Sequence, residues 1–291
     1  MRLFLVFLFF LLCLIASSAT LQAQPKDENT TLAILFEDPQ SELLTAKLIK
    51  TLSQSGFTIQ EQSLTKTINQ SLKFPNRMNL SSREASNLGQ ALGVDVFLIL
   101  RSKIVERADV GASLYGEGYL ALAFVSSRSG KLILFDFIET QQPNITLASE
   151  IIAQQLIEQL PSYTQQVLST VNKQFTPLSL DPQDAEAMEI PAEGSALAKA
   201  FDLPKFTARK QPIYTENARK MAVSAIVELE VVLRKDGKVG NVEVVHWAGF
   251  GLDESAIMAA KELKFKPALL EEKAVSSRAL IRYNFNFRNQ K

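Results

Sequence analysis

The sequence predicts a mixed α+β protein: an amino-terminal α/β domain with a mixed sheet, followed by a small domain of helices on a three-stranded antiparallel sheet. Two observations support this fold class. Continuous apolar runs alternate with helical patterns over residues 31–171, as is typical of strands buried between helices. Strict apolar–polar alternation prevails over residues 212–291, as is typical of strands with one solvated face.

The composition argues against several classes of function, namely nucleic-acid binding, metal binding and catalysis. The 291 residues include 31 Lys and Arg and 31 Asp and Glu, and this zero formal charge argues against a nucleic-acid partner. Cys13 is the only cysteine and His246 the only histidine, so neither a disulfide framework nor a Cys/His metal site can form. No nucleophile–base pair or paired carboxylates can be placed. We therefore expect no enzyme, no cofactor and no metal.

The first 23 residues have the pattern of a secretory signal peptide. Arg2 precedes the apolar run Leu3–Ile15, and small residues follow up to Ala23. As a helix this run would span about 20 Å, less than the roughly 30 Å of a bilayer core. The length favours cleavage and a periplasmic protein, and the alternative is an inner-membrane anchor formed by residues 3–23.

Residues 31–171 form the predicted α/β domain. Ser81 and Glu84 make a capping box in front of a helix that Gly93 ends, and residues 69–79 read as a loop. Val94–Leu100 lacks alternation, which indicates a strand buried on both faces. The other expected elements are strands at Leu32–Phe36, Phe57–Ile59, Ser113–Ser126 and Lys131–Ile138, and helices from Ser41 to Gly56 and from Ile145 to Leu160.

The run Leu88–Asp95, followed by the buried strand, resembles the amino-terminal domain of TolB and of related periplasmic lipoproteins. That resemblance implies a surface-binding domain. Residues 175–211 then contain Pro177, Pro182, Pro191 and Pro204, and this spacing predicts a linker. Short helices are expected within it at Gln183–Met188 and Ser195–Phe201.

Residues 212–291 form the predicted carboxy-terminal domain. Tyr214–Met221 is expected as a short helix, and Ala225 to Leu233 alternates as a strand. Asp236-Gly237 predicts the turn to a second strand, Val239–Trp247, because glycine accepts a positive φ. A helix beginning near Leu252 and a last alternating strand, Ser277–Phe287, complete the domain.

Five features in this order resemble the carboxy-terminal domain of TonB-family energy transducers: Tyr214 with Ala218-Arg219, the Asp236-Gly237 hairpin, Leu252-Asp253 with Ala256, Phe265-Lys266-Pro267-Ala268, and the aromatic last strand. Two positions depart from the family. Thr215 follows Tyr214 where the family has proline, and a glycine before the first strand is replaced near Ser224. Both departures concern how the first helix docks.

The resemblance implies a protein partner, which adds an extended segment to an exposed edge strand. Here that edge is the last strand, whose polar face carries the candidate partner-binding residues Arg278, Leu280, Arg282, Asn284 and Asn286. The arginines, together with Arg288, either select an acidic or polar partner or only protect the edge from aggregation. Lys261, Lys264 and Lys266 are expected to complement the dipole of the preceding helix.

Two functions follow as hypotheses. The first is a non-enzymatic periplasmic protein of the TonB family that binds a protein partner by edge-strand pairing, in the service of transport across the outer membrane. The second is an envelope scaffolding or assembly protein that contacts peptidoglycan or other envelope proteins. Membrane contact is expected only if the signal peptide is uncleaved.

Overall fold

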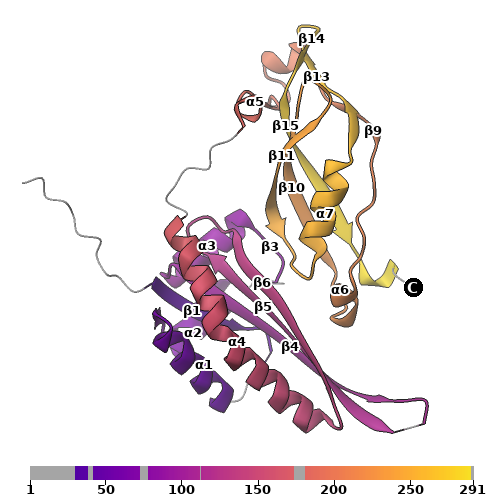
Figure 1. Cartoon of the computed structure of the whole chain (residues 1–291). Coiled ribbons are helices and arrows are strands. Elements are labelled where there is room, and N and C mark those ends of the chain that lie inside the picture. Colours follow the sequence, from indigo (N-terminus) through magenta and orange to yellow (C-terminus); the bar gives the residue numbers. More distant parts are fainter. Residues whose placement is uncertain (1–29, 39–41, 73–77, 112, 174–180, 290–291) are drawn as a thin grey trace, which may run out of the picture.

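The computed structural model describes residues 30–289 except 39–41, 73–77, 112 and 174–180. The predicted signal peptide, residues 1–23, lies outside the described residues, and so do residues 175–180 of the predicted linker. Two sheets with helices form two adjoining domains, the amino-terminal one below and the carboxy-terminal one above in Figure 1. The predicted mixed α+β fold class is confirmed.

A five-stranded mixed sheet is the framework of the amino-terminal domain, in the order β2-β1-β4-β5-β6. Its strands are β1 (Thr30–Phe36), β2 (Phe57–Ile59), β4 (Val96–Ala108), β5 (Leu114–Ser126) and β6 (Leu132–Gln142). β1 is parallel to β2 and β4, whereas β4, β5 and β6 are antiparallel. Val96–Leu100 is almost completely buried, as its continuous apolar sequence predicted. Beyond it, β4 and β5 extend as a long hairpin (Figure 1).

Helices α1 (Glu42–Gln54), α2 (Gln62–Leu72), α3 (Ser82–Leu92) and α4 (Ile145–Lys173) surround this sheet. Leu48 of α1 and Leu156 of α4 pack in the core on one face. α4 continues beyond its predicted end at Leu160, through Pro161, because Tyr163 and Val167 are buried in the same core. α2 was not predicted, although Leu64, Ile68 and Leu72 recur at every fourth position of its sequence; its last turn lies in the stretch expected as a loop, residues 69–79.

Local signals around α3 were predicted correctly. The Ser81 hydroxyl accepts a hydrogen bond from the Glu84 amide at 3.2 Å, and the Glu84 carboxylate accepts one from the Ser81 amide at 2.9 Å. Gly93 ends the helix with φ at 68°. These reciprocal bonds satisfy amide groups that a helix start leaves free, and they fix the direction in which α3 leaves the short strand before it.

A second five-stranded sheet is the framework of the carboxy-terminal domain, in the order β3-β11-β10-β15-β7. The three predicted strands form its centre, as β10 (Ala225–Leu233), β11 (Val239–Trp247) and β15 (Ser277–Phe285). The two-residue strands β3 (Leu80–Ser81) and β7 (Met188–Glu189) were not predicted. Helices α6 (Glu216–Lys220) and α7 (Leu252–Lys261) accompany the sheet, and α7 packs on it.

The segment predicted as a linker is built onto the carboxy-terminal domain from residue 181 onward. It contains α5 (Pro182–Ala185), β7, the 3₁₀ turn η1 (Leu197–Ala200), β8 (Phe201–Asp202) and β9 (Lys205–Ala208). β9 pairs with β12 (Lys264–Lys266), and β8 pairs with β13 (Ala268–Leu270), which in turn pairs with β14 (Lys273–Val275). A final turn, η2, spans Phe287–Asn289. The prolines had suggested a linker here. The short strands were not predicted because two to four residues are too few to show an apolar–polar alternation.

The two domains share one continuous apolar core. Phe250, which is 1% exposed, lies edge-on to Phe135 of β6, with ring centroids 4.8 Å apart. The Asn79 side chain inserts where β10 and β11 diverge: its amide nitrogen donates to the carbonyls of Ile226 (2.7 Å) and Trp247 (2.8 Å), and its oxygen accepts from the Ile226 amide (3.0 Å). The carboxy-terminal domain is therefore docked against the amino-terminal one. Within the described residues, no helix has the length and apolarity needed to cross a membrane.

Candidate functional site at an open sheet edge

Strand β15 has one fully paired side and one largely open side. β10 pairs with it along its whole length, from Ser277 to Phe285. On the other side, β7 pairs only with Ser277 and Arg278. Among the strands that the structure describes, none pairs with this side from Ala279 to Phe285. This stretch is therefore an edge strand.

The even-numbered residues of β15 direct their main-chain groups toward the open side. The Ser276 carbonyl accepts from the Met188 amide of β7 at 2.9 Å, and the Arg282 carbonyl accepts from the Arg209 guanidinium. Because main-chain groups alternate in direction along a strand, the amides and carbonyls of Leu280 and Asn284 face the same way. The open stretch thus presents a regular set of donors and acceptors.

Arg209 occupies part of this edge. It follows β9, donates to the Arg282 carbonyl, and lies over the Tyr283 ring with its guanidinium carbon 4.7 Å from the ring centroid. Burial raises the pKa of the Tyr283 hydroxyl, an effect that the nearby Arg209 charge partly offsets. A strand that pairs along the whole edge must displace Arg209 from this carbonyl.

Ion pairs between neighbouring strands cover the outer face of the edge. Arg282 donates to Glu228 of β10, with Nε 2.7 Å from the carboxylate. Arg278 contacts Glu230 of β10 at 3.2 Å and Glu189 of β7 at 3.3 Å. Both arginines of the predicted site are therefore charge-compensated within the chain. The alternating sequence of β10 already placed Glu228 and Glu230 on the solvent-facing side of that strand. This is the side on which they meet the arginines of β15.

The remaining predicted site residues differ in position. Leu280 lies between the two arginines and is 63% exposed, unusually open for a leucine. Asn284 is exposed on the same face. Asn286 lies just beyond the end of β15, where its side-chain oxygen accepts from the Arg288 amide at 3.0 Å. The structure thus brings Arg278, Leu280, Arg282 and Asn284 onto one face and places Asn286 at its end.

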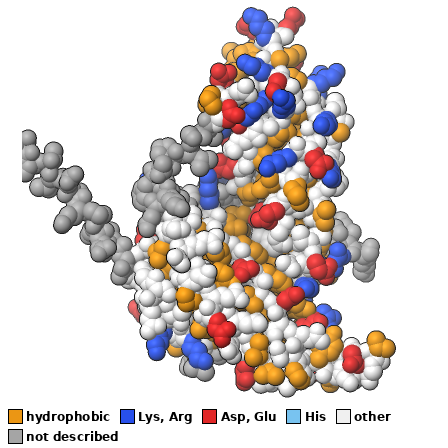
Figure 2. All heavy atoms as spheres, viewed as in Figure 1, with side chains coloured by type: hydrophobic (Ala, Val, Ile, Leu, Met, Phe, Trp, Pro, Cys, Tyr) orange, Lys and Arg blue, Asp and Glu red, His pale blue; other side chains and the backbone are white. Residues whose placement is uncertain are grey.

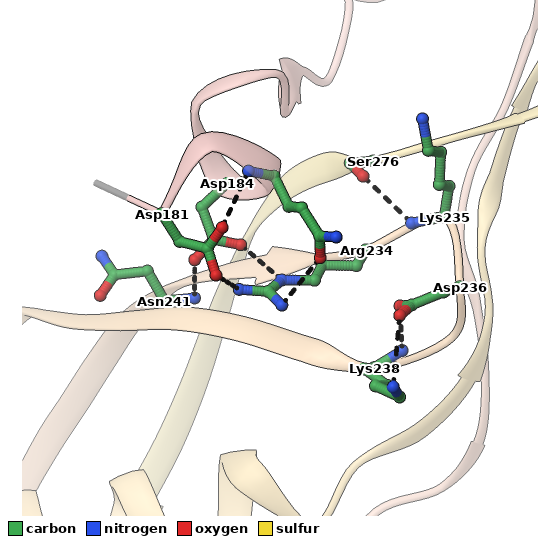
Figure 3. Close-up of polar contacts among 9 residues, drawn as sticks. Asp181, Asp184, Arg234, Lys235, Asp236, Lys238, Asn241 and Ser276 are labelled. Atoms are coloured by element: carbon green, nitrogen blue, oxygen red, sulfur yellow. Dashed lines mark hydrogen bonds and ion pairs between the residues drawn. The ribbon is translucent and has the colours of Figure 1, made fainter. Parts of the chain in front are cut away.

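A clip of polar contacts holds α5 and β7 at the start of this edge (Figure 3). The Asp184 carboxylate, 4% exposed, accepts from Arg234 Nε at 2.6 Å and from the Asn241 amide at 2.9 Å. Asp181 accepts from the other side of the Arg234 guanidinium at 2.8 Å. The hydrogen bond from Arg234 holds the pKa of Asp184 below its usual value. Sequence reasoning missed this clip, because the pairing joins residues 50 positions apart.

The two departures from the family pattern are accommodated locally. Thr215 caps α6, since its hydroxyl accepts from the Ala218 amide at 3.3 Å and donates to the Phe250 carbonyl at 2.6 Å. Two residues before Ser224, Ala222 has φ at 52°, a left-handed conformation that suits glycine. The Tyr214 hydroxyl donates to the Val223 carbonyl at 2.6 Å and fixes this turn.

His246 lies away from the open edge. Its Nδ1 is 3.8 Å from Glu228, and β3 pairs beside it through Ser81. Trp247, which follows it, is buried at the junction of the domains. His246 therefore belongs to the sheet and to the domain contact.

The carboxy-terminal domain is thus a helix packed on a sheet whose three central strands, β11, β10 and β15, are antiparallel. Residues 210–287, about a quarter of the chain, match the family described as Gram-negative bacterial TonB protein C-terminal. The resemblance predicted for Pro212–Phe287 is confirmed. The chain has no match among curated proteins.

Three solved structures illustrate the distant similarities of the fold. The hypothetical protein CT253 from Chlamydia trachomatis is 9% identical, with 47% of this chain and 98% of that chain covered and a TM-score of 0.32. Lipoprotein GNA1162 from Neisseria meningitidis is 16% identical, with coverages of 46% and 99% and a TM-score of 0.31. The TonB carboxy-terminal domain of Pseudomonas aeruginosa is 16% identical, with coverages of 33% and 92% and a TM-score of 0.26. Similarity at this level carries no inference about function, and the TolB resemblance stays a prediction.

Proposed function

We propose that this chain is a non-enzymatic protein of the cell envelope, exported to the periplasm, whose carboxy-terminal sheet binds an extended segment of a partner protein along β15. The observation that carries the proposal is the open edge between Ala279 and Phe285, with main-chain groups directed outward beside the exposed Leu280. The family match over residues 210–287 supports a protein partner and an envelope location.

The length of the edge sets the size of the bound segment. Five residues, Leu280–Asn284, extend over about 17 Å at roughly 3.3 Å per residue. A partner strand of similar length satisfies the free donors and acceptors, and its side chains meet Leu280 and the compensated arginines. Because Glu228 and Glu230 neutralise those arginines, β15 itself favours apolar or uncharged side chains at these positions.

An NMR titration of the full chain with synthetic peptides from the amino-terminal segments of outer-membrane receptors tests the proposal. We expect chemical-shift changes centred on Leu280–Asn284. If no peptide of the set shifts resonances of Ser277–Phe287, receptor recruitment is wrong.

Leu280 offers a matched pair of variants. Leu280→Pro removes an amide that faces the open edge and leaves the ladder to β10 intact, since proline is tolerated where the N–H faces away from the sheet. Leu280→Thr removes the leucine side chain and keeps the amide. We expect binding to fall about tenfold or more in Leu280→Pro through loss of main-chain pairing, and much less in Leu280→Thr. Equal binding by both variants contradicts strand pairing.

A second candidate function is that of an envelope scaffold, favoured by the docking of the carboxy-terminal domain. Phe250 and Asn79 join this domain to the amino-terminal one, so the open edge is held on a fixed platform. A fixed carboxy-terminal domain suits a scaffold that holds its partners in place better than a transducer whose carboxy-terminal domain must move. Co-sedimentation with purified peptidoglycan separates the candidates: pelleting of the chain without any receptor-peptide binding favours the scaffold.

A further inference from the structure

Two short segments of the carboxy-terminal domain carry a strong excess of positive charge. Residues 205–210 contain Lys205, Arg209 and Lys210, and residues 261–266 contain Lys261, Lys264 and Lys266 with one acid, Glu262. Six cations and one anion give a net charge of +5 here (6 − 1), whereas the whole chain is formally neutral. In Figure 2 the upper part of the molecule carries Lys and Arg side chains interspersed with Asp and Glu, so the excess belongs to these two segments and not to the whole domain surface.

Strand pairing brings these segments together. β9 and β12 form a two-stranded ribbon in which Lys205 lies directly opposite Lys266. Lys264 and Lys266 are exposed, while Phe265 between them is buried against Phe206. We call Lys205, Lys264, Lys266 and the adjoining Lys261 the lysine ribbon. Two of its members lie in a strand beyond the end of α7, so the expected role as helix-dipole charges does not describe Lys264 and Lys266.

The charges of the lysine ribbon are uncompensated within the described residues. None of its four lysines forms an ion pair there, and Glu262 instead bonds Lys210 at 2.8 Å. Like charges directly opposite each other destabilise a strand pair. The arginines of β15 behave differently, because each contacts a glutamate. Arg278 and Arg282 are thus paired with carboxylates, whereas the ribbon lysines have no carboxylate partner among the described residues.

We propose that the lysine ribbon binds carboxylates of an acidic polypeptide segment that flanks the strand paired with β15. The choice of a polypeptide rests on the proposed function. Arg209 connects the two surfaces, since it follows β9 directly and its guanidinium lies on the open edge at Arg282. A partner that displaces Arg209 from that carbonyl continues beside a basic strand pair, where Asp and Glu side chains supply the missing counter-charges.

Two synthetic peptides test the inference with the full chain. Both share a strand-forming half, chosen as the receptor segment that binds best. One continues with Asp and Glu at alternate positions, and the other carries Asn and Gln there. We expect the acidic peptide to bind about tenfold more tightly at low salt, as three or four exposed ion pairs provide, and the advantage to shrink at high salt.

The combined variant Lys205→Gln, Lys264→Gln and Lys266→Gln is expected to lose this advantage. Its matched control replaces three exposed lysines of α1 and α2, Lys47, Lys50 and Lys66, by glutamine. These exposed changes leave the folded core unaltered, and the control variant is expected to keep the tenfold preference. Equal affinities of wild-type protein for the two peptides, or an undiminished preference in the ribbon variant, overturn the inference.

Further outcomes separate this inference from the proposed function. If both peptides shift β15 resonances equally and acidity adds nothing, the open edge stands and the ribbon inference falls. If the acidic peptide binds through the ribbon while β15 resonances stay still, the edge proposal fails and the carboxylate site stands without its strand. Binding of phosphatidylglycerol vesicles that requires the ribbon lysines, without discrimination between the peptides, assigns the surface to an anionic membrane and overturns the inference.

Discussion

Replacing Asp184 by alanine is expected to release the segment that closes the start of the open edge. The buried carboxylate accepts one charged hydrogen bond from Arg234 and one from the Asn241 amide. Bonds to charged groups contribute about 1.5–3 kcal/mol each. Arg234 keeps Asp181, which is 2.8 Å away, so only part of that total is lost. We expect α5 and β7 to be destabilised locally by about 2 kcal/mol, which corresponds to a roughly 30-fold shift in the opening equilibrium.

Hydrogen exchange measures this opening at one amide. Met188 donates to the Ser276 carbonyl at 2.9 Å, so its exchange reports the pairing of β7 with β15. We expect exchange at Met188 to accelerate about 30-fold in Asp184→Ala, with far less change at Leu229 in the centre of the sheet. Glu193→Ala, an exposed carboxylate in the same segment, serves as control and is expected to leave both amides unchanged. An acceleration below about threefold at Met188 would refute the reasoning.

The same clip has a defined pH dependence. Arg234 holds the pKa of Asp184 below its unfolded value, so the stabilisation is fully present above that unfolded value. It is lost as pH falls through the folded pKa. The difference in Met188 exchange between wild type and Asp184→Ala is therefore expected to be largest near neutrality and to close in acid.

Three further predictions concern stability. Ala222→Gly is expected to raise the free energy of unfolding by about 0.5–1 kcal/mol, because it relieves the positive φ of 52° at some entropic cost; a lower denaturant midpoint than wild type contradicts this. Phe250→Ala is expected to lower that free energy by about 3–5 kcal/mol, and a double-mutant cycle with Phe135→Ala should show coupling; additive losses argue against their edge-on contact. Burial raises the pKa of Asp253 to about 7 despite hydrogen bonds from two backbone amides. The stability that protonated Asp253 contributes is therefore fully present below the usual pKa of an aspartate and is lost as the pH rises from there to about 7. Between about pH 5 and about pH 8 the wild type is expected to lose roughly 3 kcal/mol of unfolding free energy relative to Asp253→Asn, and parallel pH curves for the two proteins would refute this shift.

Local sequence signals predicted the parts of the fold in which neighbours in sequence are neighbours in space. The Ser81–Glu84 capping box, the Asp236-Gly237 turn and the alternation of β10 all act within a few residues. Strands of two residues, such as β3 and β7, have no period to detect. Their positions depend on distant partners, and so does the docking of Phe250 on β6.

The candidate site was predictable to a similar extent. Alternation in the last strand placed Arg278, Leu280 and Arg282 on one face, and the structure has them there. Their electrostatic state depends on a neighbouring strand, because Glu228 and Glu230 become partners only through the register of β10 with β15. Arg209 reaches the edge from 73 residues away, so no local pattern announces it.

The Asn79 side chain has a consequence for the order in which the protein folds. Its hydrogen-bond partner Ile226 lies 147 residues further along the chain, so this contact is completed only once the carboxy-terminal sheet has formed. Until then, the apolar face that Phe250 later covers stays open, and the folding chain is vulnerable to aggregation. For the same reason, an excised carboxy-terminal domain would lack the strand and amide that residues 79–81 supply, so expression of the domain alone should include a replacement for them.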